Sequence, residues 1–364
     1  MRKKLAITMT ILLGAVLLSA CSGGPVHGAT WPGLVTNGTT AYLSDGSVYA
    51  VNLKDGKPAW TYPGSTKLIF HAPAAVTPDG LVIVGSAGTD YSLIALNPAD
   101  INPETNAPIE AWKFTGAQDR WMAAPLVLDN KLFAPNSDGN LYILDLQDGR
   151  SVKEATVVEL GGRLWAAPTT DGERVYITSL DHSVTAVDAN TYDILWQEDL
   201  GAAVPGSAVL GEDGMLYVGS LASQLEKFDP ATGRHQTVIE AENWVWSTPS
   251  LDGDTLYFSD VDGNFYPFNT STGSLNWNPV KPDGSITASP LVSGDSILIA
   301  TESGSIYQVS KDGQSVLWSE PGGKIYTTPV AAGDLVLVAP LETEFYLAAY
   351  DQNGHQAWTF TPGK

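Results

Sequence analysis

The chain has 364 residues, of which 36 are glycine and 23 are proline, and this density of helix-breaking residues excludes an architecture of long helices. A hydrophobic fraction of 43% is enough for a large folded core and excludes general disorder. The 40 acidic and 19 basic residues give a formal net charge of −21, which argues against nucleic acid as a partner because such a surface repels phosphate backbones.

The N-terminus predicts a secretory signal. Residues 2–4 are basic, and the uncharged run over residues 5–18 is shorter than the roughly 20 residues that a membrane-spanning helix needs. A run of this length fits the apolar region of a signal peptide. It leads into Leu18-Ser19-Ala20-Cys21, which resembles the bacterial lipobox, in which the cysteine is lipidated and becomes the mature N-terminus.

Cys21 is therefore the predicted lipidation site, and as the only cysteine it excludes an intrachain disulfide. We predict a lipoprotein signal peptide over residues 1–20, a lipidated tether over residues 21–29 and a single folded domain over residues 30–364. Removal of residues 1–20 takes away three bases and no acids, which changes the net charge from −21 to −24.

The predicted location is extracytoplasmic, with the lipid holding the protein on a bacterial membrane. Ser22 follows the cysteine in place of the aspartate that retains lipoproteins in the inner membrane of two-membraned bacteria. The outer membrane is therefore expected in such a host, and the outer face of the cell membrane in a host with one membrane.

A repeat of about 40 residues accounts for the rest of the chain. Each unit starts at a residue that is usually proline and is usually preceded by a small residue, and successive starts lie 39 to 52 residues apart. The predicted unit starts are Pro32, Pro73, Pro125, Pro168, Ser207, Pro249, Pro290 and Pro329. A proline-rich insertion from Pro98 to Pro108 lengthens the second unit, where we expect a longer loop between the last two strands.

Each unit contains four short runs with β character, separated by Asp-Gly, Gly-Asp or Thr-Gly pairs that favour tight turns. Four antiparallel strands repeated at this interval predict an all-β fold, an eight-bladed β-propeller that closes into one domain. Little spare strand remains at either end, so we expect blades one and eight to close the ring by packing rather than by sharing a sheet.

A tryptophan recurs in the last strand of six units. It follows an Asn, Asp or Ser by seven or eight residues in five of them, and in the sixth it follows the insertion. These residues are Trp60, Trp112, Trp196, Trp277, Trp318 and Trp358. Lys153 and Thr237 stand at the equivalent places in blades three and five.

This pattern, seen most fully in Ala186-Val187-Asp188 with Trp196 and in Asp229-Pro230-Ala231-Thr232-Gly233, resembles the tryptophan-docking repeat of quinoprotein-type (PQQ-like) propellers. That family includes the pyrroloquinoline-quinone (PQQ) dehydrogenases and the BamB lipoproteins of outer-membrane protein assembly. The resemblance implies a structural role for the six tryptophans, each of which would lock one blade to the next.

The residues that a PQQ dehydrogenase would need are not recognisable. Such enzymes hold the quinone with a vicinal cysteine pair and a calcium ion, whereas Cys21 is the only cysteine here and no matching set of oxygen ligands can be mapped. The five histidines are scattered singly, and the stretch from Asp260 to Asn264 lacks the glycine and glutamate of a calcium loop. We therefore expect no enzyme activity, no PQQ or other cofactor and no metal, with residues 260–264 forming a hairpin turn.

Aromatic and basic residues recur three and five positions before the unit starts. Because side chains alternate along a strand, we predict that they share one axial side and form a binding funnel at the mouth of the central channel. The candidate funnel residues are Phe70, Arg120, Arg163, Trp165, Trp244, Trp246, Lys324 and Tyr326. The alternative interpretation is that these aromatics plug the channel or pack under loops.

The function predicted from these features is a non-enzymatic, BamB-like scaffold that docks other envelope proteins, as a monomer or within a hetero-complex. The first alternative is a module that binds a small molecule, sugar or peptide in the funnel. A PQQ-dependent dehydrogenase comes third. The sequence leaves the identity of the partner or ligand open.

Overall fold

The computed structural model describes residues 31–146 and 156–363, and these ranges contain strands, turns and loops but no helix. In this part of the chain there is accordingly no helix long and apolar enough to cross a membrane. The predicted signal peptide, the tether with Cys21, and Lys153 lie outside the described residues.

The strands form eight antiparallel sheets of four, which follow one another along the chain. The first four sheets contain β1 (Gly33–Thr36), β2 (Thr40–Asp45), β3 (Ser47–Asn52) and β4 (Pro58–Tyr62); β5 (Ala75–Val76), β6 (Val82–Gly85), β7 (Leu93–Ile101) and β8 (Pro108–Phe114); β9 (Leu126–Leu128), β10 (Lys131–Pro135), β11 (Asn140–Asp145) and β12 (Thr156–Glu159); and β13 (Thr169–Thr170), β14 (Arg174–Thr178), β15 (Ser183–Asp188) and β16 (Ile194–Asp199).

The second half of the chain repeats this arrangement. Its sheets contain β17 (Val209–Leu210), β18 (Leu216–Ser220), β19 (Gln224–Phe228) and β20 (His235–Glu240); β21 (Ser250–Asp252), β22 (Thr255–Ser259), β23 (Phe265–Asn269) and β24 (Ser274–Leu275); β25 (Leu291–Ser293), β26 (Ser296–Ala300), β27 (Ile306–Ser310) and β28 (Ser315–Ser319); and β29 (Val330–Ala332), β30 (Leu335–Val338), β31 (Leu347–Tyr350) and β32 (Gln356–Phe360).

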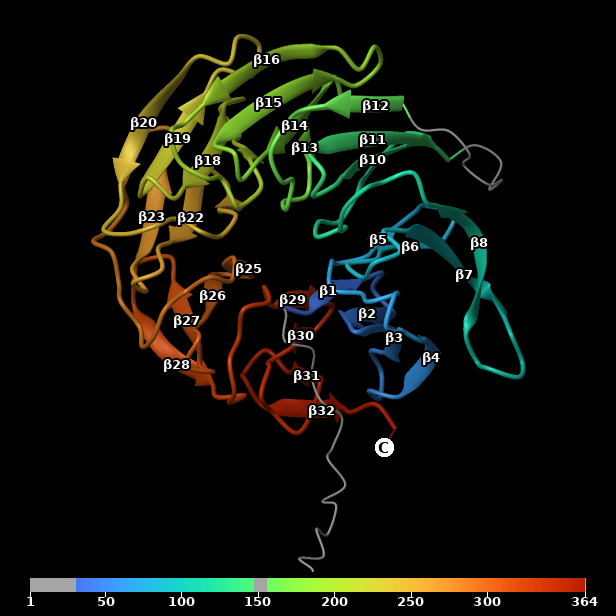
Figure 1. Cartoon of the computed structure of the whole chain (residues 1–364). Helices are drawn as coiled ribbons and strands as arrows, with labels where there is room; N and C mark the ends of the chain where they lie inside the picture. The colour runs from blue at the N-terminus through green and yellow to red at the C-terminus, as the bar shows by residue number, and fades with distance from the viewer. Residues whose placement is uncertain (1–30, 147–155, 364) are drawn as a thin grey trace, which may run out of the picture.

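Figure 1 shows the eight sheets arranged around one axis, with the first strand of each near the centre and the fourth at the rim. The predicted eight-bladed β-propeller is confirmed. Among the described residues, the core consists of eight hydrophobic clusters, each of which joins the facing sides of two neighbouring blades. The repeat therefore buries its apolar side chains between blades, as stacked repeats do.

The insertion in blade 2 differs from the prediction of a longer loop. β7 and β8 extend into it, and only residues 102–107 form the turn between them. The pairing of these strands is irregular between Asn97 and Ile101, beside Pro98, because proline has no N–H to donate to a ladder. The prolines therefore interrupt the strand pairing without ending the hairpin, which projects from the ring in Figure 1.

Packing closes the ring, as the sequence predicted, because blades 1 and 8 remain separate sheets. Trp358 in β32 donates its indole N–H to the backbone oxygen of Leu53 (2.9 Å), and Thr327 donates its hydroxyl to the backbone oxygen of Pro32 (2.7 Å). One buried cluster contains side chains from both blades. Hydrogen bonds, these two among them, and a shared core thus join blade 1 to blade 8.

The small residues beside the unit starts have a second role near the axis. Ser207 donates its backbone N–H to the hydroxyl of Thr248 (2.8 Å), Thr248 donates to Ser289 (3.1 Å), and Ser289 donates to Thr328 (3.0 Å). These bonds run from blade 5 to blade 8. The small side chains therefore fit a crowded axis and also connect its blades through hydroxyl groups.

Four of the repeated tryptophans donate the indole N–H to a backbone carbonyl in the following blade. The pairs are Trp196 with Pro230 (2.8 Å), Trp277 with Lys311 (3.0 Å), Trp318 with Gln352 (3.3 Å) and Trp358 with Leu53 (2.9 Å). The turn that receives each ring contains a glycine with positive φ, and a Cβ at Gly233 would lie 2.8 Å from the Trp196 ring. Trp60 and Trp112 are buried, at 4% and 3% exposure.

Hairpin turns are stabilised by buried or half-buried aspartates, and Asp171 shows the pattern. Its carboxylate accepts hydrogen bonds from the backbone N–H groups of Glu173 (2.9 Å) and Arg174 (2.7 Å), the Arg174 guanidinium (2.7 Å) and the Tyr176 hydroxyl (2.7 Å). Burial raises the pKa of Asp171, but the hydrogen bonds, with Tyr176 the strongest contributor, outweigh it and leave the pKa below its usual value.

We expect Asp171→Asn to lower the free energy of unfolding by about 1–3 kcal/mol at pH 7, because it removes charge-assisted hydrogen bonds. A depressed pKa favours the folded state above the unfolded-state pKa of about 3.9, and this contribution is lost as the pH falls through the folded-state pKa. The difference between variant and wild type should therefore shrink below about pH 4 in urea unfolding. Glu173→Gln, at a side chain 82% exposed in the same turn, is the control and should change little.

Candidate functional site

In seven of the eight blades, the segment that leads into the first strand is held by the same kind of backbone hydrogen bond. A carbonyl five residues before the blade start, which is the buried residue directly before the first strand, accepts the N–H of the turn after the blade's second strand. The N···O distances are 2.6–3.0 Å. The accepting residues are Ile69, Arg120, Arg163, Ala203, Trp244, Ser285 and Lys324. This bond fixes the backbone from which the predicted funnel residues project.

The same bond corrects the predicted register in two blades. The buried blade starts are Ala74 and Ala208, one residue after Pro73 and Ser207. The prediction that Phe70 lines the funnel was wrong, because Phe70 is 0% exposed and packs in the core between blades 1 and 2. His71 occupies the position in blade 2 that Trp165 occupies in blade 4.

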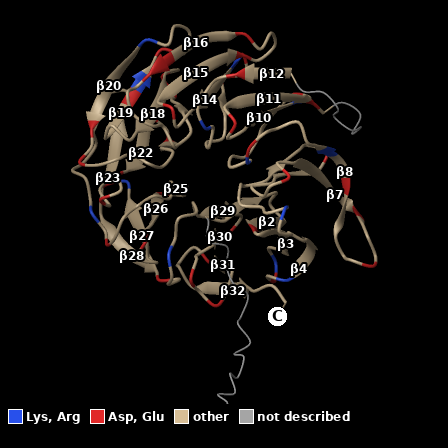
Figure 2. Ribbon diagram, viewed as in Figure 1, with Lys and Arg blue, Asp and Glu red and all other residues tan. Residues whose placement is uncertain are grey.

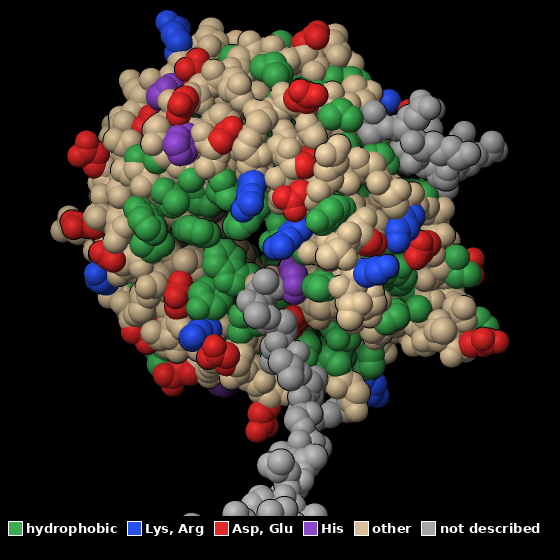
Figure 3. All heavy atoms as spheres, viewed as in Figure 1, with side chains coloured by type: hydrophobic (Ala, Val, Ile, Leu, Met, Phe, Trp, Pro, Cys, Tyr) green, Lys and Arg blue, Asp and Glu red, His purple; other side chains and the backbone are tan. Residues whose placement is uncertain are grey.

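The remaining predicted residues occupy equivalent positions on the approach to the inner strands. Together with two residues that were not predicted, they define what we call the axial mouth: Trp31, His71, Arg120, Arg163, Trp165, Trp244, Trp246, Lys324 and Tyr326. Figure 3 shows the face on which hydrophobic side chains gather beside the central opening, with Lys and Arg side chains close by.

Three indoles of the axial mouth are substantially exposed: Trp31 at 42%, Trp165 at 36% and Trp244 at 50%. Trp165 is held by a hydrogen bond from its indole N–H to the Ser137 hydroxyl (3.1 Å). Large exposed aromatic side chains are typical of protein-binding surfaces, where they contribute contact area at a low cost in conformational entropy.

Trp31 was not predicted as a site residue. It lies at the start of blade 1 and contacts aromatic residues of two other blades. Its ring stacks on Tyr326 of blade 8 (5.4 Å between centroids, 13° between planes) and meets Trp246 of blade 6 edge-on (5.5 Å, 71°). A sequence signal existed, because Trp31 stands directly before Pro32, where most other units have a small residue. Three aromatic rings thus come together beside the axis.

The basic residues of the axial mouth differ in how they are paired. Lys324 forms an ion pair with Glu342 (3.1 Å), which raises the pKa of Lys324. Arg120 and Arg163 are exposed, and within residues 31–146 and 156–363 neither guanidinium forms an ion pair. Figure 2 shows acidic residues distributed around the whole ring, so two unpaired guanidinium groups distinguish this site.

Two polar atoms at the level of the aromatic ring cluster are buried without a hydrogen-bond partner in the described part of the chain. They are Nδ1 of His71 and the hydroxyl oxygen of Thr287. Burial lowers the pKa of His71, although the nearby Asp45 carboxylate opposes that shift. The axial mouth therefore combines exposed indoles with guanidinium groups and a half-buried imidazole.

The described residues contain no group of three or more His, Cys, Asp or Glu side chains placed to hold a metal ion. In the stretch resembling a calcium loop, the Asp260 carboxylate accepts bonds from the backbone N–H groups of Asp262 (3.0 Å) and Asn264 (2.9 Å) and from the Tyr266 hydroxyl (2.7 Å). Its oxygens thus stabilise a hairpin turn between β22 and β23.

Comparison with known proteins agrees with this architecture. The family model described as outer membrane protein assembly factor BamB matches residues 180–288 and 280–363, just over half of the chain. BamB of Legionella pneumophila is 25% identical over 199 residues, 52% of this chain and 50% of that protein. BamB of Yersinia pestis is 22% identical over 298 residues, 78% of this chain and 73% of that protein.

The chain thus spans about half the length of the Legionella relative that it matches. Among solved structures, BamB from Moraxella catarrhalis superposes with a TM-score of 0.69 at 19% identity, over 84% of this chain and 92% of that one. The computationally designed Ika8 protein superposes with a TM-score of 0.70 at 13% identity, over 88% and 95%. At these identities the superpositions establish the propeller fold alone.

The repeat, the eight-bladed ring and the family match over blades 4 to 8 lead to one assignment. This chain belongs to the family of the outer membrane protein assembly factor BamB.

Proposed function

We propose that this protein is a non-enzymatic scaffold in the assembly of outer membrane proteins, held outside the cytoplasm by a lipid on Cys21. Membership in the BamB family is the observation that carries the proposal. The lipobox-like Leu18-Ser19-Ala20-Cys21 supports the lipid attachment, and Ser22 supports the outer membrane as its location.

The axial mouth is the proposed docking surface for a protein partner of the assembly machinery. Its aromatic side chains offer apolar contact area, and Trp244 and Trp165 are the most accessible of those that were predicted from the sequence. A small number of buried aromatic and arginine side chains usually supplies most of the affinity of a protein interface. The repeated backbone bond holds the segments that carry them in place before binding.

The chemistry of the axial mouth favours a partner segment that is both apolar and acidic. Carboxylates of such a segment can pair with Arg120 and Arg163, while its apolar side chains pack on the exposed indoles. The net charge of −24 that remains after removal of residues 1–20 repels acidic partners elsewhere on the surface, so this pairing also orients the encounter. The proposal includes no cofactor and no metal.

Crosslinking in intact cells tests this function. A photoreactive phenylalanine analogue in place of Trp244, which is 50% exposed, should yield one dominant adduct with a protein of the outer-membrane assembly machinery, identified by mass spectrometry. The matched position is Leu195 in β16, which is 46% exposed at the rim and should not give that adduct. Identical adducts from both positions, or none from Trp244, would contradict the proposal.

A further inference from the structure

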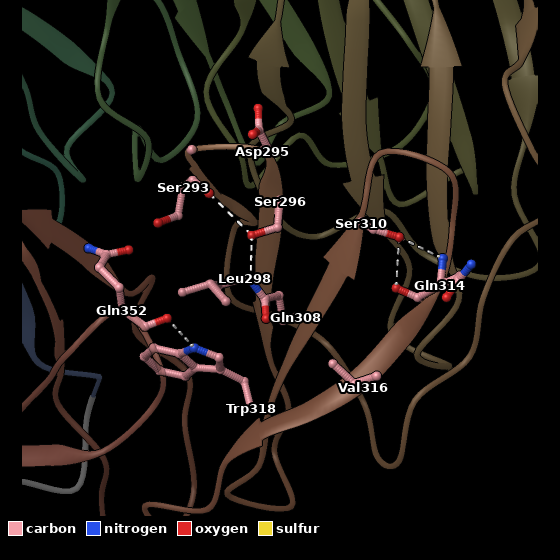
Figure 4. Close-up of a pocket in the computed structure, with 11 residues that line it drawn as sticks. Ser293, Asp295, Ser296, Leu298, Gln308, Ser310, Gln314, Val316, Trp318 and Gln352 are labelled. Atoms are coloured by element: carbon pink, nitrogen blue, oxygen red, sulfur yellow. Dashed lines mark hydrogen bonds between the residues drawn. The ribbon is translucent and has the colours of Figure 1, made fainter.

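A cavity of about 500 Å³ lies between the outer parts of blades 7 and 8, separate from the axial mouth. Figure 4 shows its lining: side chains of β26, β27 and β28 on one side, the turn before β26 above them, and Gln352 of blade 8 facing them. The volume is within the range of roughly 300–1,000 Å³ that is typical of small-ligand pockets.

The cavity lies beside a position in the second strand whose side chain differs between blades. Blades 2, 3 and 8 carry Ile83, Phe133 and Leu337 there. In blades 1, 4, 5 and 6 the middle of the second strand carries a tyrosine, at Tyr42, Tyr176, Tyr217 and Tyr257. In blade 7 the same register position is Leu298, paired with Gln308. The Tyr176 hydroxyl reaches Asp171 in the first hairpin of its blade, so a tyrosine at position 298 would extend toward Asp295 and fill this space.

The cavity wall combines polar and apolar side chains and is nearly uncharged. The Gln308 amide donates to the Ser296 hydroxyl (2.8 Å), which donates to the backbone oxygen of Ser293 (3.2 Å). The Gln352 amide and Asp295 add further hydrogen-bonding groups, and Asp295 is the only charged residue of the lining. The lining contains no Lys, Arg or His, so it has nothing with which to neutralise a phosphate or a carboxylate.

Trp318 supplies an aromatic wall with a defined orientation. Its indole N–H is used in the bond to the backbone oxygen of Gln352, which fixes the ring across the junction of the two blades. In β28 the pairing with β27 passes from Leu317 to Ser319, so Trp318 is the bulged residue. Figure 4 shows its ring beside Leu298, below the Gln308 side chain.

We propose that this cavity binds a neutral, hydroxyl-rich sugar of about disaccharide size. Amide and hydroxyl groups both donate and accept hydrogen bonds, which matches the alternating demands of sugar hydroxyls. The flat C–H face of a sugar ring packs on aromatic side chains, and the Trp318 indole lines this cavity. The site does not depend on the proposed scaffold function, since it uses other blades and other residues.

Titration calorimetry on the full chain, in a detergent without a sugar headgroup, tests this proposal with maltose and with the N-acetylglucosamine disaccharide chitobiose. We expect saturable binding of at least one sugar with a Kd of about 1 mM or lower. Glucose 6-phosphate should bind at least ten-fold more weakly, because no basic residue lines the cavity.

Two variants locate the binding without disturbing the fold. Gln308→Ala restores the alanine found opposite the tyrosine in blades 1 and 4, and should weaken binding at least five-fold. Leu298→Tyr fills the cavity with the side chain of four other blades and should abolish binding. Gln197→Ala is the control, because it removes an amide that likewise donates to a hydroxyl, that of Thr185 in blade 4 (3.0 Å), and does not line this cavity.

The proposal is overturned if neither disaccharide binds saturably to the wild-type protein. It is equally overturned if Leu298→Tyr binds as the wild type does, or if glucose 6-phosphate binds more tightly than the neutral sugars. Melting curves recorded for each variant separate the loss of the site from the loss of the fold.

Discussion

Replacing Trp165 and Trp244 together by alanine is expected to reduce capture of the assembly partner at least ten-fold while shifting the melting temperature by no more than about 3 °C. Both side chains are exposed, at 36% and 50%, so their loss removes contact area from the docking surface and little from the core. Aromatic residues at the centre of an interface commonly contribute about 2 kcal/mol or more each, which corresponds to more than ten-fold in affinity.

Trp246 is a poorer choice for this experiment because it meets Trp31 edge-on within the aromatic cluster. The matched control is Ile194→Ala with Leu195→Ala, which removes two side chains of 44% and 46% exposure from the rim and should leave capture unchanged. Capture is measured by affinity purification with quantitative mass spectrometry. Unchanged capture by the tryptophan variant, or a large fall in its melting temperature, would assign both indoles to the fold instead.

Trp358→Ala is expected to lower the free energy of unfolding by about 3–5 kcal/mol, the usual cost of removing a packed tryptophan. Its ring packs against Gly56, where a Cβ would lie 2.7 Å from it, and its N–H bonds to Leu53. These contacts join blade 8 to blade 1, which no shared sheet connects. Loss of the ring therefore weakens the closure of the whole propeller.

The equivalent change at Trp277 is the internal comparison, since that indole makes the same kind of bond to Lys311 and packs on Gly313. Blades 6 and 7 are consecutive in the chain, so the chain connection still holds them together, and the loss should be about half as large. Urea unfolding of both variants measures the difference. If Trp277→Ala is as destabilising as Trp358→Ala, then the junction between blades 8 and 1 depends on its tryptophan no more than the junction between blades 6 and 7 does.

Local sequence patterns were sufficient for the architecture. Turn residues at regular intervals and short β runs between them predicted eight blades of four strands, because hairpin formation depends on residues close together in the chain. The spacing from Asp188 to Trp196 and its equivalents located the interblade tryptophans for the same reason. The prediction that blades 1 and 8 close the ring by packing followed from the strand count, which left little spare strand at either end to form a shared sheet.

Which side chains belong to the candidate site depended on the exact residue at which each blade starts. Local sequence patterns define that residue less well than they define the number of strands. Prolines marked the blade starts correctly in six blades, but in blades 2 and 5 the buried residue is an alanine one position later. A shift of one residue exchanges a buried for an axial side chain, so Phe70 was placed in the funnel although it lies in the core.

The sequence by itself determined the repeat, the number of blades and the residues that dock one blade on the next, because these depend on spacing along the chain. Only the tertiary structure decided that Trp31 meets Trp246 and Tyr326, and that Leu298 leaves a cavity against blade 8. These features join residues far apart in the sequence or depend on the volume left between two blades. Such contacts exist only once the ring has closed.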